Sequence, residues 1–170
     1  MKKIVFLLYT MMMIVGLGAF AQGDKKKPAS PPMEAQAKVG EAMVTINYSS
    51  PGVKGRTIYG DLVPYGKIWR AGANNATTFE SDKDLKLNGK DLPAGKYALF
   101  VIPMKDKAWT VIFNADPNQW GAYNHDASKD VLRIEAETAE IDATERLTYV
   151  IKDGKVHMDW ATTRMHFTIE

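Results

Sequence analysis

Apolar and polar residues alternate along much of the chain with a period of two, which is the spacing of a β-strand with one buried face. The clearest stretches span residues 44–48, 131–134, 147–151, 156–160 and 165–169. Helical spacing is hard to find from residue 42 onward. The pattern therefore predicts a series of short strands, each with one face toward a core and the other toward water.

Two stretches, residues 97–102 and 109–113, are apolar at both alternating positions. Strands that are covered on both faces have this composition, so we expect these two to form the centre of the core. The connection between them, Met104 to Lys107, is short and mostly polar. This length and polarity suit the turn of an antiparallel hairpin.

The pairs Asn88-Gly89 and Asp153-Gly154 each predict a tight hairpin, because these residues accept the positive φ angles that such turns need. A third hairpin is considered around residues 161–163. Helix is expected only as single turns, near residues 59–62 and 117–119. Short strands with frequent turns indicate an all-β fold, a single antiparallel β-sandwich or, if the sheet closes on itself, a barrel.

The N-terminus has the composition of a secretory signal peptide. Lys2 and Lys3 precede an uncharged apolar run, and Ala19-Phe20-Ala21 supplies the small-x-small pattern of a cleavage site. Residues 22–33 are rich in Lys and Pro and are expected to form a flexible linker, followed by one β-sandwich domain over residues 34–170. We expect export to the periplasm or the medium, with no membrane span after cleavage.

The chain holds 22 basic and 20 acidic residues and no cysteine. Without Lys2 and Lys3 the counts are 20 and 20, so the exported protein would be neutral and is not expected to bind nucleic acid. The absence of cysteine excludes disulfides, thiol nucleophiles and thiolate metal sites. No cofactor is expected.

Polar and aromatic residues gather in the two longest irregular segments, which suggests a ligand-binding rim. An alternative is that the arginines bond to carboxylates or loop carbonyls and that the tryptophans seal one end of the sandwich. The candidate ligand-binding residues are Arg56, Trp69, Arg70, Asn74, Thr77, Trp120 and Tyr123.

Other chemistry is less well supported by the sequence. His157, Asp159 and His166 lie on the polar sides of two expected neighbouring strands, but the spacing is not that of a metal site and no metal is expected. An acid–base site would need His125 with Asp126 or Asp130 and an arginine in one pocket.

Several motifs together resemble the domain-of-unknown-function family numbered 2911, over roughly residues 34–170. The resemblance implies a small exported bacterial protein of mainly β structure with no established activity. Members often carry Glu where this chain has Asn75 and an aromatic residue where it has His125. The motifs are Pro51, Val53-Lys54-Gly55-Arg56, Gly60-Asp61-Leu62-Val63-Pro64-Tyr65-Gly66, Trp69-Arg70, Gly72-Ala73-Asn74, Leu92-Pro93-Ala94-Gly95-Lys96-Tyr97 and Gln119-Trp120-Gly121-Ala122-Tyr123.

Three functions remain open. We favour a non-catalytic binding module of the cell envelope that holds a small polar or carbohydrate-like ligand, or a partner protein, at the rim. The first alternative is a hydrolase or isomerase with an Asp/His/Arg site in the same rim. The second is a purely structural envelope protein in which the conspicuous arginines and tryptophans are packed and satisfied.

Overall fold

The computed structural model describes residues 28–170. The expected signal peptide and residues 22–27 of the expected linker lie outside the described residues. The first strand takes in Pro32 and Met33, which the sequence assigns to the linker. Pro32 is tolerated there because it opens an edge strand, where its missing N–H breaks no hydrogen bond within the sheet.

Seven strands form one antiparallel sheet in the order β1-β2-β3-β6-β7-β8-β9, and β4 and β5 form a separate hairpin. The strands are β1 (Pro32–Val39), β2 (Ala42–Ser49), β3 (Thr77–Ser81), β4 (Leu85–Leu87), β5 (Lys90–Leu92), β6 (Gly95–Ile102), β7 (Trp109–Asn114), β8 (Asp130–Lys152) and β9 (Lys155–Thr168). The predicted all-β antiparallel fold is confirmed. The second layer is small, however, and the main sheet itself curls around the core.

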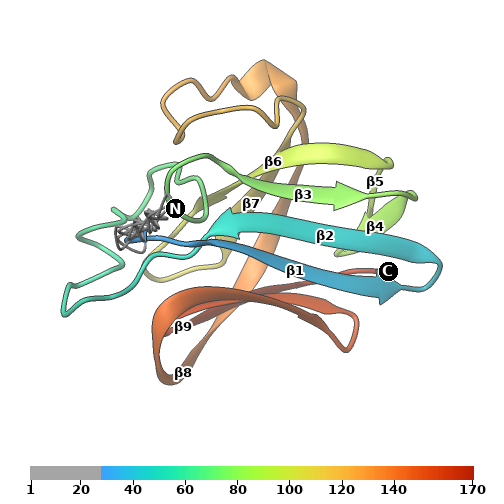
Figure 1. Cartoon of the computed structure of the whole chain (residues 1–170). Helices are drawn as coiled ribbons and strands as arrows, with labels where there is room; N and C mark the ends of the chain where they lie inside the picture. The colour runs from blue at the N-terminus through green and yellow to red at the C-terminus, as the bar shows by residue number, and fades with distance from the viewer. Residues whose placement is uncertain (1–27) are drawn as a thin grey trace, which may run out of the picture.

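The curl brings the two ends of the sheet toward each other, so that β8 and β9 lie beneath β1 and β2 (Figure 1). The far half of β8 bonds to the segment that follows β2, because Leu147 N donates to Pro51 O at 3.0 Å and Val53 N donates to Glu145 O at 2.8 Å. Ser50 Oγ also donates to Leu147 O at 2.8 Å. The result is a half-barrel, the barrel-like form that the sequence allowed.

Strand β9 folds back on itself around Ala161–Thr163, as the sequence suggested. Ala161 has a φ of 53°, which turns the chain, and the strand's two halves then run side by side. Ile169 N donates to Gly154 O at 2.9 Å. The rings of His157 and His166 face each other with centroids 5.8 Å apart. Both halves also pair with β8, which bends with them and is one long strand rather than the two short ones expected.

The core has two parts, one on each face of β6 and β7. Leu99, Val101, Val111 and Phe113 belong to the main cluster inside the curl. On the opposite face a smaller cluster of Ala76, Ala98, Phe100 and Ile112 packs beneath Ala122. Both central strands are therefore covered on both faces, as predicted, and the irregular segment 115–129 forms the second cover.

The expected single helical turns near residues 59–62 and 117–119 are wrong. Gly60 has a φ of 93°, which a right-handed helix cannot contain. Near residue 118 the carboxylate of Asp116 accepts from Asn118 N at 3.3 Å, which forms a side-chain turn instead. The one short helix among residues 28–170 is a 3-10 turn at Ala127–Lys129, N-capped by Asp126.

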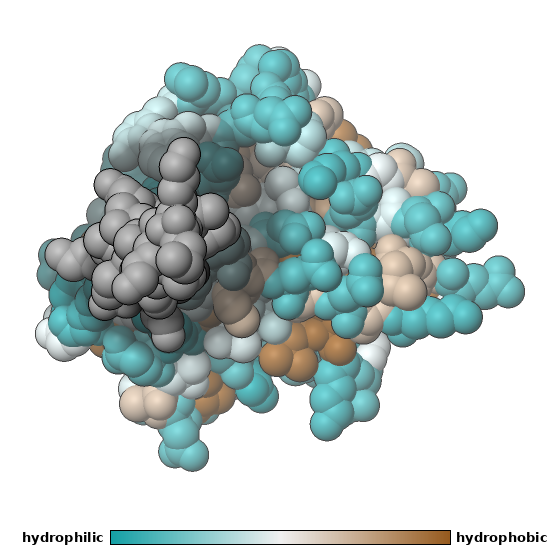
Figure 2. All heavy atoms as spheres, viewed as in Figure 1, coloured by the Kyte–Doolittle hydropathy of each residue, from teal (hydrophilic) through white to brown (hydrophobic). Residues whose placement is uncertain are grey.

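Hydrophobic residues on the face shown in Figure 2 form small separate spots in a mainly hydrophilic surface. The described residues contain no helix that is long and apolar enough to span a membrane.

Candidate functional site

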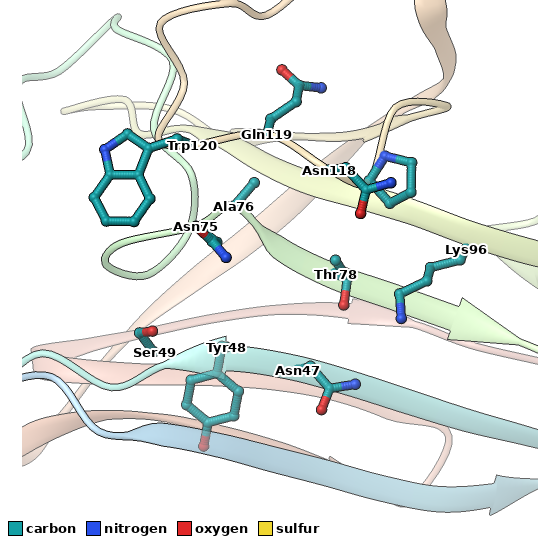
Figure 3. Close-up of a pocket in the computed structure, with 11 residues that line it drawn as sticks. Asn47, Tyr48, Ser49, Asn75, Ala76, Thr78, Lys96, Asn118, Gln119 and Trp120 are labelled. Carbon is teal, nitrogen blue, oxygen red and sulfur yellow. The ribbon is translucent and has the colours of Figure 1, made fainter.

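An open groove of about 490 Å³ lies between the outer face of the sheet and the segment 117–120. Strands β2, β3 and β6 supply Asn47, Thr78 and Lys96 to one side of it. Asn118 and Trp120 lie on the other side, with Trp120 at one end and Asn118 and Lys96 toward the other (Figure 3). Amides, hydroxyls and one amine thus share the groove with the large indole of Trp120.

The register of the sheet explains why the floor is polar. Asn47 lies opposite Thr78 in the β2–β3 pair, and Thr78 lies opposite Ala98 in the β3–β6 pair. Their neighbours Ile46 and Phe79 point into the main core and are fully buried. Because side chains alternate between faces, the polar residues point outward together.

Trp120 is held by the backbone on both sides of it. Gln119 O accepts from Ala76 N at 2.9 Å, and Gly121 N donates to Asn74 O at 3.1 Å. The side chain itself is free of this framework, and Trp120 is 63% exposed. A large indole that is anchored yet open to solvent is suited to stacking on a flat or cyclic ligand.

Behind the groove, amide side chains stabilise the loop. Gln119 points away from β2 and β3 (Figure 3), and its Nε2 donates to Asn114 Oδ1 at 3.1 Å and to Asp116 O at 2.7 Å. Asn114 Nδ2 in turn donates to Asp126 O at 2.9 Å and to Asp130 Oδ1 at 2.7 Å. The wall that carries Trp120 is therefore tied to strands β7 and β8.

Asp130 is the centre of this network. His125 Nε2 lies 2.8 Å from its Oδ1, and the Arg133 guanidinium donates twice to its Oδ2. Burial raises the pKa of Asp130, but hydrogen bonds from Asn114, Arg133 and His125 outweigh burial and hold the pKa below its usual value. The structure thus assembles the His/Asp/Arg set considered from the sequence, with Asp130 rather than Asp126 as its carboxylate.

The bonds of this set favour a stabilising role. Both oxygens of Asp130 are engaged by neighbouring side chains, and only 5% of its side chain is exposed. The His125 ring packs edge-on against Phe100 at 5.1 Å. None of His125, Asp130 and Arg133 lines the groove. We therefore interpret these residues as a brace for the loop.

A smaller hollow of about 240 Å³ is lined by residues of the segments 62–70 and 122–123. Its walls include Pro64, Lys67, Ile68, Arg70 and Tyr123. Burial lowers the pKa of the Arg70 guanidinium, an effect that nearby Tyr123 partly opposes. Arg70 Nε is buried and has no hydrogen-bond partner among the described residues.

The seven residues predicted to bind ligand do not form one cluster. Trp120 lines the groove, while Trp69, Arg70 and Tyr123 line the smaller hollow. Asn74 has a φ of 59°, and its Nδ2 donates to Ser49 Oγ at 3.3 Å. Arg56 and Thr77 line neither cavity.

Three of these residues make bonds that support the fold. Arg56 donates to the carbonyls of Val53 and Gly52, at 3.0 and 2.6 Å. The buried Trp69 donates to Gly72 O at 3.0 Å and stacks on Trp160, and the buried Thr77 donates to Ala71 O at 2.9 Å. For Arg56, hydrogen bonding to loop carbonyls is the alternative to ligand binding that the sequence left open.

Five groove residues were not predicted from the sequence: Asn47, Asn75, Thr78, Lys96 and Asn118. A signal was present for two of them, because Asn47 and Thr78 are polar positions within otherwise regular strand patterns. The outward face of a strand is usually polar, so this signal alone does not distinguish a site from a solvated surface.

Two of the three candidate metal residues, Asp159 and His166, are engaged by other side chains. Arg164 donates twice to the carboxylate of Asp159, and His166 Nε2 lies 3.2 Å from Glu137 Oε2. Within residues 28–170 no group of three or more His, Asp or Glu side chains is placed to hold a metal ion.

Together these features define a small all-β protein in which a curled antiparallel sheet carries an open polar groove and an adjacent cationic hollow. The chain belongs to the family described as protein of unknown function (DUF2911), whose model matches residues 30–169. No curated protein and no solved structure matches the chain.

Proposed function

We propose that the protein is a non-catalytic module of the cell envelope that binds a carbohydrate-like ligand in the groove beside Trp120. The observation that carries this proposal is the exposed indole of Trp120, fixed by its backbone at the end of a cavity with a polar floor. Sugar rings present apolar C–H faces that pack on aromatic rings, and hydroxyls that bond to amides.

The polar groups around the groove fit such a ligand. Asn47, Asn75 and Asn118 each offer an amide donor and acceptor, and Thr78 adds a hydroxyl. Lys96 is paired with Glu80 at 3.1 Å, so its charge is partly balanced. The groove therefore favours a neutral polar ligand over an anion, and its openness suits an extended chain of sugar units.

The compartment is part of the proposal. The signal-peptide pattern at residues 1–21 supports export, and the family resemblance supports a bacterial envelope setting. An envelope protein that binds sugars would meet cell-wall or surface polysaccharides there. Export can be checked by fractionating cells that produce the full chain and sequencing the N-terminus of the exported form, which we expect to begin at Gln22.

The binding test is a thermal-shift and calorimetric titration of the purified protein with soluble chitotetraose, cellotetraose and maltotetraose. A sugar present at about 100 times its dissociation constant should stabilise the protein by about 2.7 kcal/mol. Trp120→Ala should weaken binding of that sugar at least about tenfold, because stacking is lost. Tyr123→Ala is the matched control, since Tyr123 is exposed on the same turn but does not line the groove.

Two results would contradict the proposal. One is the absence of binding by any of the three tetrasaccharides at millimolar concentration. The other is binding that Trp120→Ala and a floor variant, Asn47→Ala, both leave unchanged. The floor variant also guards against a Trp120→Ala protein that fails to fold.

A further inference from the structure

The smaller hollow beside the groove has a chemistry of its own. Arg70 and Lys67 both line it, and both precede β3 in the sequence. Two cationic side chains therefore share one cavity. No Asp or Glu is among the residues that line it. Within residues 28–170, neither Arg70 nor Lys67 forms an ion pair.

Arg70 differs in its hydrogen bonds from three other arginines of the protein. Arg56 bonds to two backbone carbonyls, Arg133 to Asp130, and Arg164 to Asp159. Arg70 Nε, by contrast, is buried with no acceptor in the described part of the chain. Buried donors are normally satisfied, so an acceptor supplied by a ligand would complete the hydrogen bonding of this one.

The backbone fixes the position of Arg70 closely. Its carbonyl accepts from Thr77 N at 3.2 Å. The preceding residue, Trp69, exchanges both backbone hydrogen bonds with Val101 of β6, each at 2.8 Å. The guanidinium is therefore presented from a segment that is hydrogen-bonded to the end of β6, so little order would have to be gained on binding.

The other walls of the hollow are apolar or aromatic. Leu62, Pro64 and Ile68 contribute aliphatic surface, and Tyr123 contributes an exposed ring. We propose that this hollow is an anion site that binds an organic carboxylate, with the carboxylate on Arg70 and Lys67 and its carbon skeleton against these apolar walls. The planar fork of a guanidinium matches the two oxygens of a carboxylate.

The size of the hollow sets the size of the ligand group. At about 240 Å³ it is below the range of ordinary drug-sized pockets, and it suits a small acid or the acidic end of a larger molecule. Neither Trp120 nor the floor of the groove takes part, so this site goes beyond the proposed sugar binding and is independent of it.

The test is an NMR titration of the ¹⁵N-labelled protein with benzoate, with its neutral amide analogue benzamide, and with inorganic phosphate. We expect saturable shifts of the amides around Arg70 and Tyr123 with benzoate, and none with benzamide. Phosphate should bind more weakly than benzoate, because it gains nothing from the apolar walls. Equal binding of phosphate and benzoate would overturn the assignment of an organic carboxylate.

Variants then locate the site. Arg70→Gln should weaken benzoate binding by about 10- to 150-fold, as expected for the loss of hydrogen bonds to a charged group. Lys67→Gln, an exposed change, should weaken it by about two- to fivefold. Arg56→Gln is the matched control and should leave it unchanged, as should Trp120→Ala.

The proposal is overturned if benzoate produces no saturable shifts, or if it binds Arg70→Gln and Lys67→Gln as tightly as the unchanged protein. Because Lys67 is exposed, its variant tests the site even if Arg70→Gln does not fold. If Arg70→Gln loses benzoate binding but still binds the sugar, the hollow and the groove are separate sites.

Discussion

His157 is a residue whose protonation the fold opposes. Burial lowers its pKa first, and the positive charges of Arg164, His166 and Lys155 lower it further, while Asp159 acts in the opposite direction. Its Nδ1 is buried without a partner among the described residues. The neutral ring is therefore the form that the folded protein favours.

This shift makes stability depend on pH in a defined direction. The unfolded chain takes up a proton on His157 near pH 6.5, whereas the folded protein does so only at lower pH. The unfolded state thus binds more protons as the pH falls through 6.5, and the free energy of unfolding should decrease. Urea unfolding at pH 7.5, 6.5 and 5.5 measures this decrease.

The comparison variant is His157→Gln, which keeps a polar side chain but cannot take up the proton. The free energy of unfolding of the variant, minus that of the unchanged protein, should rise as the pH falls from 7.5 to 5.5. All other titrating groups are common to both proteins, so this rise reports on His157. A difference between the two proteins that stays constant over this range would contradict the assignment to His157.

At the scale of elements, two hairpin turns of the same type serve different purposes. Asn88-Gly89 joins β4 to β5 with φ angles of 48° and 75°, and Asp153-Gly154 joins β8 to β9 with 52° and 67°. Asn88 also bonds outside its hairpin, donating to Glu135 O and accepting from Thr168 N at 2.8 Å. The small hairpin is thereby attached to the main sheet.

Replacement of the first turn residue by Gly separates the two purposes, because Gly accepts the same positive φ in both turns. Asn88→Gly should lower the free energy of unfolding by about 1–2 kcal/mol through the lost side-chain hydrogen bonds. Asp153→Gly loses only an exposed contact with Lys152 and should change it by less than about 0.5 kcal/mol. Equal losses in urea unfolding would mean that the Asn88 bonds contribute little.

These turns could be predicted from the sequence because their chemistry is local. Strand β1 and the middle of β8 could not be predicted in this way, because they lack a local apolar pattern. In β1 none of the eight positions is buried, and the strand is held in the sheet by pairing with β2 along its whole length. Residues 137–146 of β8 have no buried position, so the apolar pattern stops although the strand continues.

At the scale of the whole molecule, the candidate site was predicted in part. The exposed aromatics of the loop, Trp120 and Tyr123, were identified because large side chains in irregular segments are conspicuous. The groove floor was missed, since Asn47 and Thr78 become neighbours only through strand register. From the sequence, His125 was considered with Asp126 or Asp130 and an unnamed arginine, and only as an acid–base site. The bracing role depends on Asp130 being enclosed by Asn114, His125 and Arg133, which the sequence does not show.

The aromatic core links segments that are distant in the sequence. Tyr59 lies edge-on to Trp109 at 4.7 Å and to Trp160 at 6.2 Å, and Trp69 stacks on Trp160 at 5.8 Å. These residues come from a loop, from the rim and from β7 and β9. One half of the sheet therefore cannot open without exposing the cluster that the other half helps to bury.

This arrangement predicts a single cooperative unfolding transition. Emission from the buried tryptophans reports on the aromatic cluster, while far-UV circular dichroism reports on the strands. The two signals should give the same midpoint in urea. The exposed Trp120 would add emission that does not follow the core, so the measurement is made in Trp120→Phe, which retains an aromatic ring. Midpoints that differ beyond error would show that the β8–β9 end of the half-barrel unfolds separately from the rest of the sheet. The hydrogen bond between Ser50 and Leu147 would then not couple the two parts.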